Sequence, residues 1–211
     1  MSGKSRRRLT GLIVLAVMAT SATAQKNEVA GGGGRSVVPD QAIQPGPIPL
    51  GDNFVRFGNG TTWEANYARH LLNHGFYAVD AEVPLVGTPD QPLTSGNGAV
   101  PHNYASLFLT PAARVRFFAQ NTFQLWVSGG GGLGHWTISN TLVFGGINPG
   151  PKTKNGAVAQ GGVGLDLRPW KHLGFRVAAR DFYSGVLPLN VNTGRSHQHN
   201  IAVTGGVIWS F

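Results

Sequence analysis

Alternation of apolar and polar residues with a period of two is the feature that most constrains this chain. The last segment shows it well, because Val203, Val207 and Trp209 fall on one face of an extended chain while Thr204 and Ser210 fall on the other. Similar alternation recurs along the sequence, and no window sustains the 3.6-residue period of a helix. The 31 Gly and 13 Pro residues also interrupt the chain too often for long helices. The sequence therefore predicts an all-β protein.

Eight segments are predicted to be strands, seven from their alternation and the first mainly from the need to close the sheet. They are 26–38, 56–70, 75–86, 104–118, 122–137, 155–168, 172–184 and 197–211. Their connections alternate between short turns and long loops. The long loops are 39–55, 87–103, 138–154 and 185–196. This arrangement is typical of an eight-stranded antiparallel up-and-down transmembrane β-barrel.

The first residues have the parts of a cleavable signal peptide. Lys4 and a run of arginines precede an apolar stretch at 9–18, and a small-residue cleavage site ends at Ala24. That stretch is shorter than the roughly 20 residues of a membrane-spanning helix. We therefore expect a signal peptide at 1–24, Sec export and a barrel domain at 25–211. Its removal leaves 13 Lys and Arg against 9 Asp and Glu, dispersed along the chain, so nucleic acid is not an expected partner.

Charge decides which face of the barrel is expected to turn outward. Only 12% of the residues are charged, which is too few to cover an ordinary wetted surface, since soluble domains carry about 25%. The charges on the strands nearly balance, and Arg suits pairing inside a narrow barrel better than Lys does. The predicted interior charges are Glu64, Asp80, Glu82, Asp166, Arg114, Arg116, Arg168, Arg176 and Arg180. The apolar faces, with aromatic residues near the strand ends, are then expected to meet lipid.

Three segments make the chain resemble a known family. GFYAVDAEVPLVG, TPAARVRFF and the C-terminal GGVIWSF, with the signal peptide and eight strands, resemble the small outer-membrane β-barrel proteins of the OmpA/OmpX-like superfamily. The resemblance covers essentially the whole mature chain. It implies that Val207, Trp209 and Phe211 form the terminal signal that the barrel assembly machinery reads. Pro84 and Pro111 depart from regular strands, and each is expected to mark a β-bulge because proline removes a ladder donor.

Histidines give the one candidate metal site. The chain has no cysteine, which excludes disulfides, thiolate metal sites and cysteine nucleophiles. His197 and His199 lie two residues apart and share a strand face, so they could chelate a metal together with His102 or His135. No nearby carboxylate completes the set. We therefore expect neither a metal nor a cofactor.

The segment HWTISN gives the one candidate catalytic site. His135, Ser139 and Asn140 faintly resemble the His and Ser-Asn of lipid A deacylases, in which His takes the Ser proton. The spacing differs, and no acid lies nearby in the sequence to orient the His. Continuous alternation would also hold His135 and Ser139 roughly 13 Å apart. We therefore expect the two side chains not to pair.

Together these features favour a monomeric, non-enzymatic barrel of the bacterial outer membrane. Its partners would be outer-membrane lipids and the barrel assembly machinery. Its role would be structural, in envelope integrity, or in surface interaction through four long extracellular loops. Two alternatives remain: a lipid A-modifying, deacylase-like outer-membrane enzyme, and a secreted soluble barrel of lipocalin type with its apolar face inward. The loop sequences name no ligand.

Overall fold

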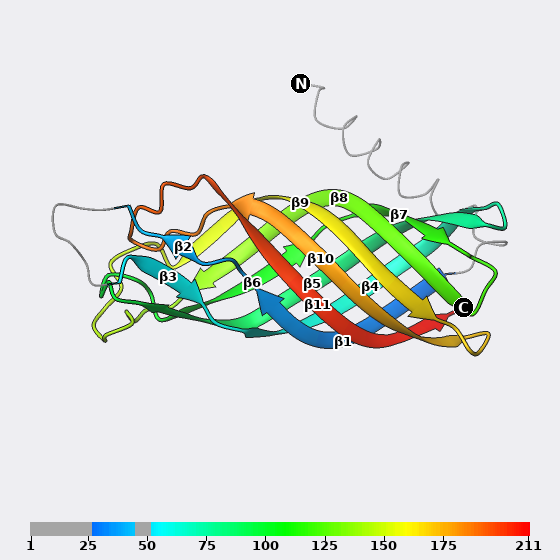
Figure 1. Ribbon diagram of the computed structural model, residues 1–211, viewed down its shortest axis with the longest axis horizontal. Helices are drawn as coiled ribbons and strands as arrows, with labels where there is room; N and C mark the ends of the chain where they lie inside the picture. Colours follow the sequence, from blue (N-terminus) through cyan, green and yellow to red (C-terminus); the bar gives the residue numbers. More distant parts are fainter. Residues whose placement is uncertain (1–26, 45–51) are drawn as a thin grey trace, which may run out of the picture.

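The computed structural model describes residues 27–44 and 52–211, and its regular elements are all β-strands (Figure 1). The strands are β1 (Asn27–Val37), β2 (Gln41–Ala42), β3 (Phe54–Phe57), β4 (Gly60–Asn73), β5 (Tyr77–Ser95), β6 (Asn103–Leu109), β7 (Ala112–Phe117), β8 (Phe123–Ile138), β9 (Thr153–Leu167), β10 (Leu173–Gly185) and β11 (His197–Ser210). No helix within these ranges is long and apolar enough to cross a membrane. The predicted signal peptide lies outside the described residues. The all-β prediction is confirmed.

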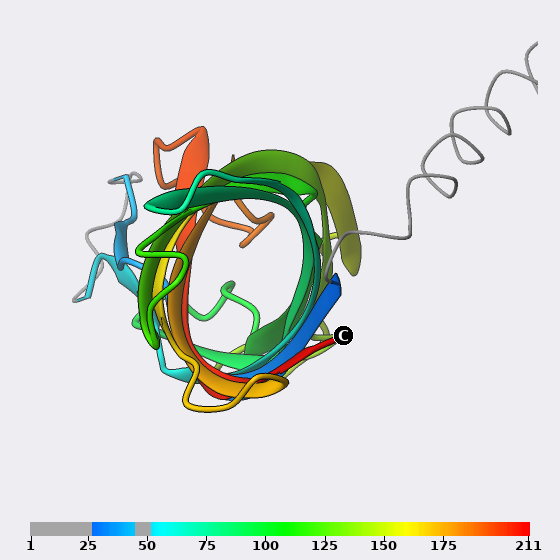
Figure 2. The same cartoon turned by 90° about the vertical axis from the view of Figure 1, so that its right-hand side faces the viewer.

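The long strands close into an antiparallel barrel, seen along its axis in Figure 2. β1 closes the ring because it pairs with β4 on one edge and with β11 on the other, so that Val29 stands opposite both Tyr67 and Trp209. β6 and β7 together fill one place in the ring, between β5 and β8. With β6 and β7 counted as one, the predicted ring of eight strands is confirmed.

The two ends of the barrel differ. At one end, here the turn end, short connections join the strands, and Asn27 and Phe211 exchange backbone hydrogen bonds of 2.7 and 2.9 Å. At the other, the loop end, the longer segments 96–102, 139–152 and 186–196 connect the strands. β2 also lies there, inside the predicted loop 39–55, and β3 spans the end of that loop and the first two residues of the predicted strand 56–70. Both chain ends of the barrel therefore lie at the turn end, as its even strand count requires.

The expected β-bulges at Pro84 and Pro111 are wrong. Leu109 at the end of β6 pairs with Leu85, and Ala112 at the start of β7 pairs with Glu82. The two pairs are therefore three residues apart on each strand, and no residue is inserted in either. The ladder is interrupted instead, and the Thr110 N–H donates to the Pro84 carbonyl at 3.3 Å. The Gly131 N–H donates to the Pro111 carbonyl at 3.2 Å, so Pro84 faces the β6–β7 side of its strand whereas Pro111 faces β8. Each proline therefore removes a donor from a different ladder at the break between β6 and β7, and no extra residue is needed.

β5 continues to Ser95, well past its predicted end at residue 86. Its inward side chains remain buried beyond that point, at Thr88, Gln91 and Leu93. The register shifts between Thr88 and Gln91, and β3 then pairs with the end of β5. The predicted loop 87–103 is therefore largely strand. β5 stays extended there because the side chains on its inward face are buried.

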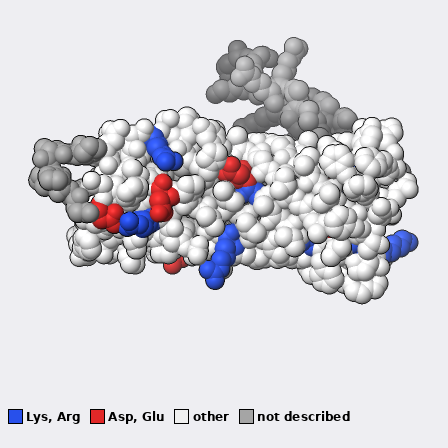
Figure 3. Space-filling view, viewed as in Figure 1, with Lys and Arg blue, Asp and Glu red and all other residues white. Residues whose placement is uncertain are grey.

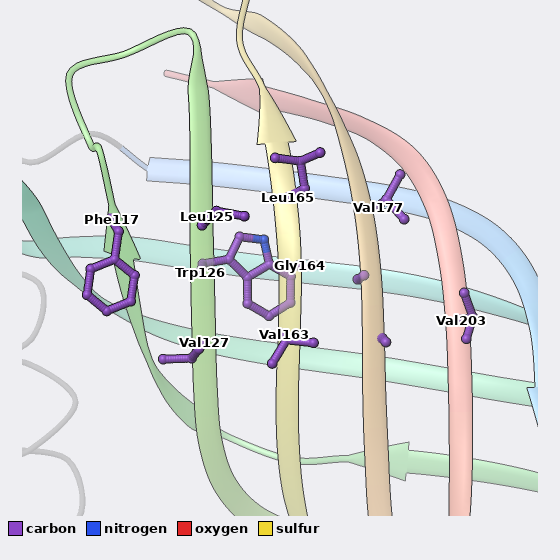
Figure 4. A pocket seen from close by; sticks show the side chains of 11 residues that line it. Phe117, Leu125, Trp126, Val127, Val163, Gly164, Leu165, Val177 and Val203 are labelled. Atoms are coloured by element: carbon purple, nitrogen blue, oxygen red, sulfur yellow. The ribbon is translucent and has the colours of Figure 1, made fainter.

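The outer surface of the barrel is apolar. On the face shown in Figure 3, Lys, Arg, Asp and Glu are few. Outward side chains such as Val163, Val177 and Val207 are half exposed. Exposed aromatic residues include Tyr67, Tyr77, Phe123, Phe175, Trp209 and Phe211. An apolar groove of about 590 Å³ crosses this surface, walled by Leu125, Val163 and Val177 around a floor at Gly164 (Figure 4).

Candidate functional site

The charged residues predicted for the interior lie inside the barrel. All but Arg168 are buried, and the Arg168 side chain, near the turn end, is 15% exposed. Strand alternation places them there, because β4, β5, β7, β9 and β10 each turn every second side chain inward. The structure adds Glu28 of β1, which is 1% exposed. Five acids and five arginines therefore face one another inside the described barrel.

Glu28 joins three arginines, two from the strands β7 and β10 and one from the turn after β9. Its Oε1 accepts hydrogen bonds from Arg114 Nη2 at 2.9 Å and from Arg176 Nη2 at 2.8 Å, and its Oε2 accepts one from Arg168. The sequence-based set missed Glu28 because the first strand was assigned mainly from closure. One signal could have found it: four predicted interior acids faced five arginines, so one acid was lacking.

Asp80 forms a second centre nearer the turn end. Its Oδ2 accepts hydrogen bonds from Arg114 Nε at 2.9 Å and Arg116 Nε at 2.7 Å. Its Oδ1 lies 2.5 Å from His70 Nδ1, which is also 2.9 Å from Arg116 Nη2. Asp80 and Arg114 stand opposite each other on β5 and β7, so the register of the sheet itself sets this contact.

Arg180 forms the third centre, toward the middle of the barrel. Its Nε donates to Glu64 at 3.0 Å and its Nη1 to Glu82 at 2.7 Å, while Asn66 donates to Glu82 at 2.9 Å. Thr204 donates to the other Glu64 oxygen at 2.7 Å. Buried charges are costly unless they are paired, and this network pairs each of them across several strands.

Trp126 stands among these charges. Its indole Nε1 donates to Asp166 at 3.0 Å, and the guanidinium carbons of Arg180, Arg176 and Arg114 lie 5.0, 5.3 and 5.9 Å from its ring centre. Cations over an indole face are attracted by the ring quadrupole, more strongly where water is excluded. Gly164 makes room for the ring, since a Cβ there would lie 2.3 Å from it. The period-two pattern of segment 122–137 puts Trp126 on the same face as Gln124 and Ser128, but it does not show what the indole contacts.

Toward the loop end the interior changes from charged to apolar. Phe108 stacks on Phe182 with ring centres 4.5 Å apart and meets Trp136 edge-on at 5.6 Å. Leu187 and Leu189, from segment 186–196, join the same buried cluster. The interior therefore has two filled layers: an ion-pair layer and an aromatic layer that a loop covers.

The loops are tied to one another. Asn190 Nδ2 donates to Asn148 Oδ1 at 2.8 Å and to the Ala99 carbonyl at 3.0 Å, which links segment 186–196 to the two other long loops. Asn190 adopts a φ of 61°, in the left-handed region that Asn tolerates better than most residues. Phe144 and Ile147 project from this cap and are 73% and 85% exposed.

The histidine and serine of HWTISN do not contact each other. His135 Nδ1 lies 2.6 Å from Asn155 Oδ1, and its Nε2 lies 3.3 Å from Thr137 Oγ1. Ser139 Oγ lies 3.0 Å from Thr141 Oγ1 instead. No hydrogen bond joins His135 to Ser139 in the described part of the chain.

His197 and His199 share an outward face, as their spacing predicts, but a carboxylate does lie beside them. Asp181 Oδ2, on the neighbouring strand β10, is 2.6 Å from His199 Nδ1, so the expectation of no nearby carboxylate is wrong. Strand pairing brings the two together, which spacing along one segment cannot show. Tyr183 stacks on His197 at 5.0 Å. Within the described ranges, no group of three His, Asp or Glu residues is placed to hold a metal ion.

The terminal strand carries its aromatic residues outward. Val207, Trp209 and Phe211 are 50%, 52% and 58% exposed. Trp209 pairs across to Val29 and Leu173, so the end of β11 belongs to the closed sheet. Its role as an assembly signal stays a prediction.

Comparison with solved structures supports this architecture. No known family profile and no curated protein matches the sequence. Ail, the attachment invasion locus protein of Yersinia pestis, superposes with a TM-score of 0.51 at 11% identity, covering 90% of this chain and 100% of Ail. The outer membrane protein OprG from Pseudomonas aeruginosa gives a TM-score of 0.51 at 13% identity, covering 89% and 96%. The fold is that of a small outer-membrane β-barrel.

More distant similarity extends to an enzyme. The outer membrane enzyme PagL superposes with a TM-score of 0.45 at 14% identity, covering 85% of this chain and 97% of PagL. The outer-membrane barrel fold of this chain does not by itself assign a role.

Proposed function

We propose that this chain is a closed, non-enzymatic outer-membrane barrel with a role in envelope structure or surface interaction. Its apolar exterior suits lipid, and its charged interior is the inverse of a soluble lipocalin-like barrel. The turn end, with both chain ends, would face the periplasm, and the loop end would face the exterior. Residues 1–24 would direct export.

The filled interior is the observation that carries the proposal. The ion-pair layer around Trp126 and the aromatic layer around Phe182 occupy the barrel at two heights. An eight-stranded barrel is just wide enough for its own side chains, so little room remains for a solute path. Among the described residues His135 and Ser139 are not paired, and we therefore assign the function to the outer surface and the loop cap.

The loop cap supports a surface role. Asn190 holds three loops together, which lowers the entropy that a binding partner would otherwise have to remove. Phe144 and Ile147 present exposed apolar side chains on this cap. Loops held on a rigid scaffold are where binding residues are most often found.

Two measurements test the proposal together. The chain should be recovered in outer membranes and should migrate differently on gels before and after boiling, because a closed barrel resists detergent at room temperature. Purified protein in planar bilayers should show no stepwise ion conductance. Recovery in the soluble periplasmic fraction would overturn the membrane assignment, and reproducible conductance steps would overturn the closed interior.

A third measurement addresses the role. A strain that lacks the gene should recover the envelope phenotype of its parent strain when the wild-type chain is expressed. If the role is surface interaction, a chain carrying Phe144→Ser and Ile147→Ser should assemble normally but fail to restore that phenotype. If the role is structural, the double variant should restore it fully. Failure of the wild-type chain to change any envelope or surface property would contradict both roles.

A further inference from the structure

The turn end of the barrel contains a polar pocket of about 270 Å³. It lies between the interior charge network and the short turns. Its lining residues come from β4, β7, β8 and β11 and from the turns 118–122 and 168–172. They are His70, Asn73, Arg116, Ala119, Gln120, Asn121, Thr122, Gln124, Arg168, Trp170, Lys171 and Ser210. The pocket therefore combines strand ends, which the ring holds in fixed register, with two short turns.

The lining is cationic and contains no carboxylate. Arg116, Arg168 and Lys171 supply positive charge, and His70 adds a titratable ring. The acids that pair with the two arginines are Asp80, Glu28 and Asp166, which are buried and do not line the pocket. Because the interior network already balances five acids with five arginines, Lys171 is a cation in excess of that balance at the pocket.

The pocket also has one buried hydrogen-bond donor without a protein partner. Arg168 Nη1 donates to Ser210 at 3.0 Å and its Nη2 to Asp166 at 3.0 Å, but its buried Nε has no hydrogen-bond partner. Arg116 Nη1, in contrast, is held by Gln124 at 2.8 Å. A buried donor left unpaired carries a desolvation cost that an acceptor from a ligand would remove.

We propose that this pocket binds an oxyanion, a phosphate or a carboxylate, entering from the turn end. Arginine forks match the geometry of both groups, and a lysine adds point charge at the rim. The pocket is larger than a single oxyanion, so it suits an anionic group carried on a larger molecule. Trp170, Gln120 and Asn121 also line the pocket and would lie beside the rest of that molecule. Binding itself does not depend on the membrane orientation proposed above. Only the conclusion that the ligand comes from the periplasm rests on that proposed orientation.

Indole N–H signals in two-dimensional NMR of the folded chain in detergent micelles provide the test. The chain has five Trp residues, and the Trp170 signal is identified by its loss in Trp170→Phe. The probes are inorganic phosphate and triglycine with either a free or an amidated carboxyl end, each compared with chloride at equal ionic strength. We expect saturable shifts of Trp170 with phosphate, with free triglycine or with both, and none with the amidated peptide. The outer-surface Trp63 and the buried Trp136 should not move.

A matched pair of variants locates the site. Lys171→Gln should weaken binding about two- to fivefold, as expected for the loss of one exposed charge. Lys152→Gln, at the loop end, should leave the affinity unchanged. Arg168→Gln should abolish the saturable shift. An equal response to chloride, no response to phosphate and free triglycine, or the same affinity in both lysine variants would overturn the proposal.

Discussion

Arg176 donates two parallel hydrogen bonds to Asp166, from Nε to Oδ1 and from Nη2 to Oδ2, both 2.7 Å long. The two residues stand directly opposite each other on β10 and β9. Arg176 Nη2 also donates to Glu28 Oε1 at 2.8 Å. One guanidinium therefore joins three strands, since β1, β9 and β10 each contribute a charge to it. Removing this arginine would leave Asp166 with only the single hydrogen bonds from Arg168 and Trp126.

Arg176→Ala is expected to lower the free energy of unfolding by about 3–5 kcal/mol, because it leaves two buried carboxylates short of a partner. Residual water in the barrel would reduce this figure. The measurement is urea unfolding of the purified chain in lipid vesicles. Arg56→Ala is the control, since the Arg56 side chain is 51% exposed and its pair with Asp52 should contribute less than about 1 kcal/mol. Equal effects of the two variants would contradict the buried network.

Gly164→Ala is expected to destabilise the barrel by about 1–3 kcal/mol, since a new Cβ would lie 2.3 Å from Trp126 and 2.6 Å from the Val177 carbonyl. Gly161→Ala in the same strand is the control, because nothing lies within 4 Å of a Cβ there. The measurement compares the unfolding midpoints of the two variants under identical conditions. A Gly164→Ala chain as stable as Gly161→Ala would mean that Trp126 does not occupy the position described.

Asn190→Ala is expected to loosen the loop cap. Two hydrogen bonds disappear, each contributing about 1 kcal/mol, so local opening and chymotrypsin cleavage after Phe144 should rise about tenfold or more. The global unfolding midpoint should change little. Arg195→Ala, an exposed position in the same loop, should cleave at the wild-type rate. An unchanged cleavage rate in Asn190→Ala would show that the loops do not depend on this contact.

Ser139→Ala is expected to leave envelope lipid composition unchanged. A general base must lie within hydrogen-bond reach of the nucleophile, and His135 instead contacts Asn155 and Thr137. Mass spectrometry of lipid A from cells expressing the variant or a matched wild type makes the comparison. Altered acylation in the variant would revive the deacylase-like alternative.

Strand alternation predicted the ring because each strand has one face toward lipid and one toward the interior. The same pattern placed Arg114, Asp80 and Arg180 on the inner face. It failed where a partner strand decides the outcome. Pro84 and Pro111 interrupt two ladders at the break between β6 and β7 without a β-bulge, and β5 extends to Ser95 because β3 and β6 pair with it.

Contacts across the barrel could not be read from spacing. Glu28 and Arg176 are 148 positions apart, and Glu64 and Arg180 are 116 apart, so that only closure of the ring brings each pair together. Asp181 beside His199 is a similar case, since strand pairing supplies the carboxylate that the local sequence lacks. The turn-end pocket likewise takes its lining from opposite sides of the ring.

The sequence by itself determined that the chain forms β-strands, which side chains of each strand face lipid and which face the interior, and which charges lie inside. These follow from a period-two pattern that each segment carries alone. The tertiary structure decided which charges pair, how Trp126 is enclosed, and that Leu187 and Leu189 cover the aromatic layer. The physical reason is register: shifting one strand by a single residue would turn all of its side chains to the opposite face, and register is fixed only when all eight strands close.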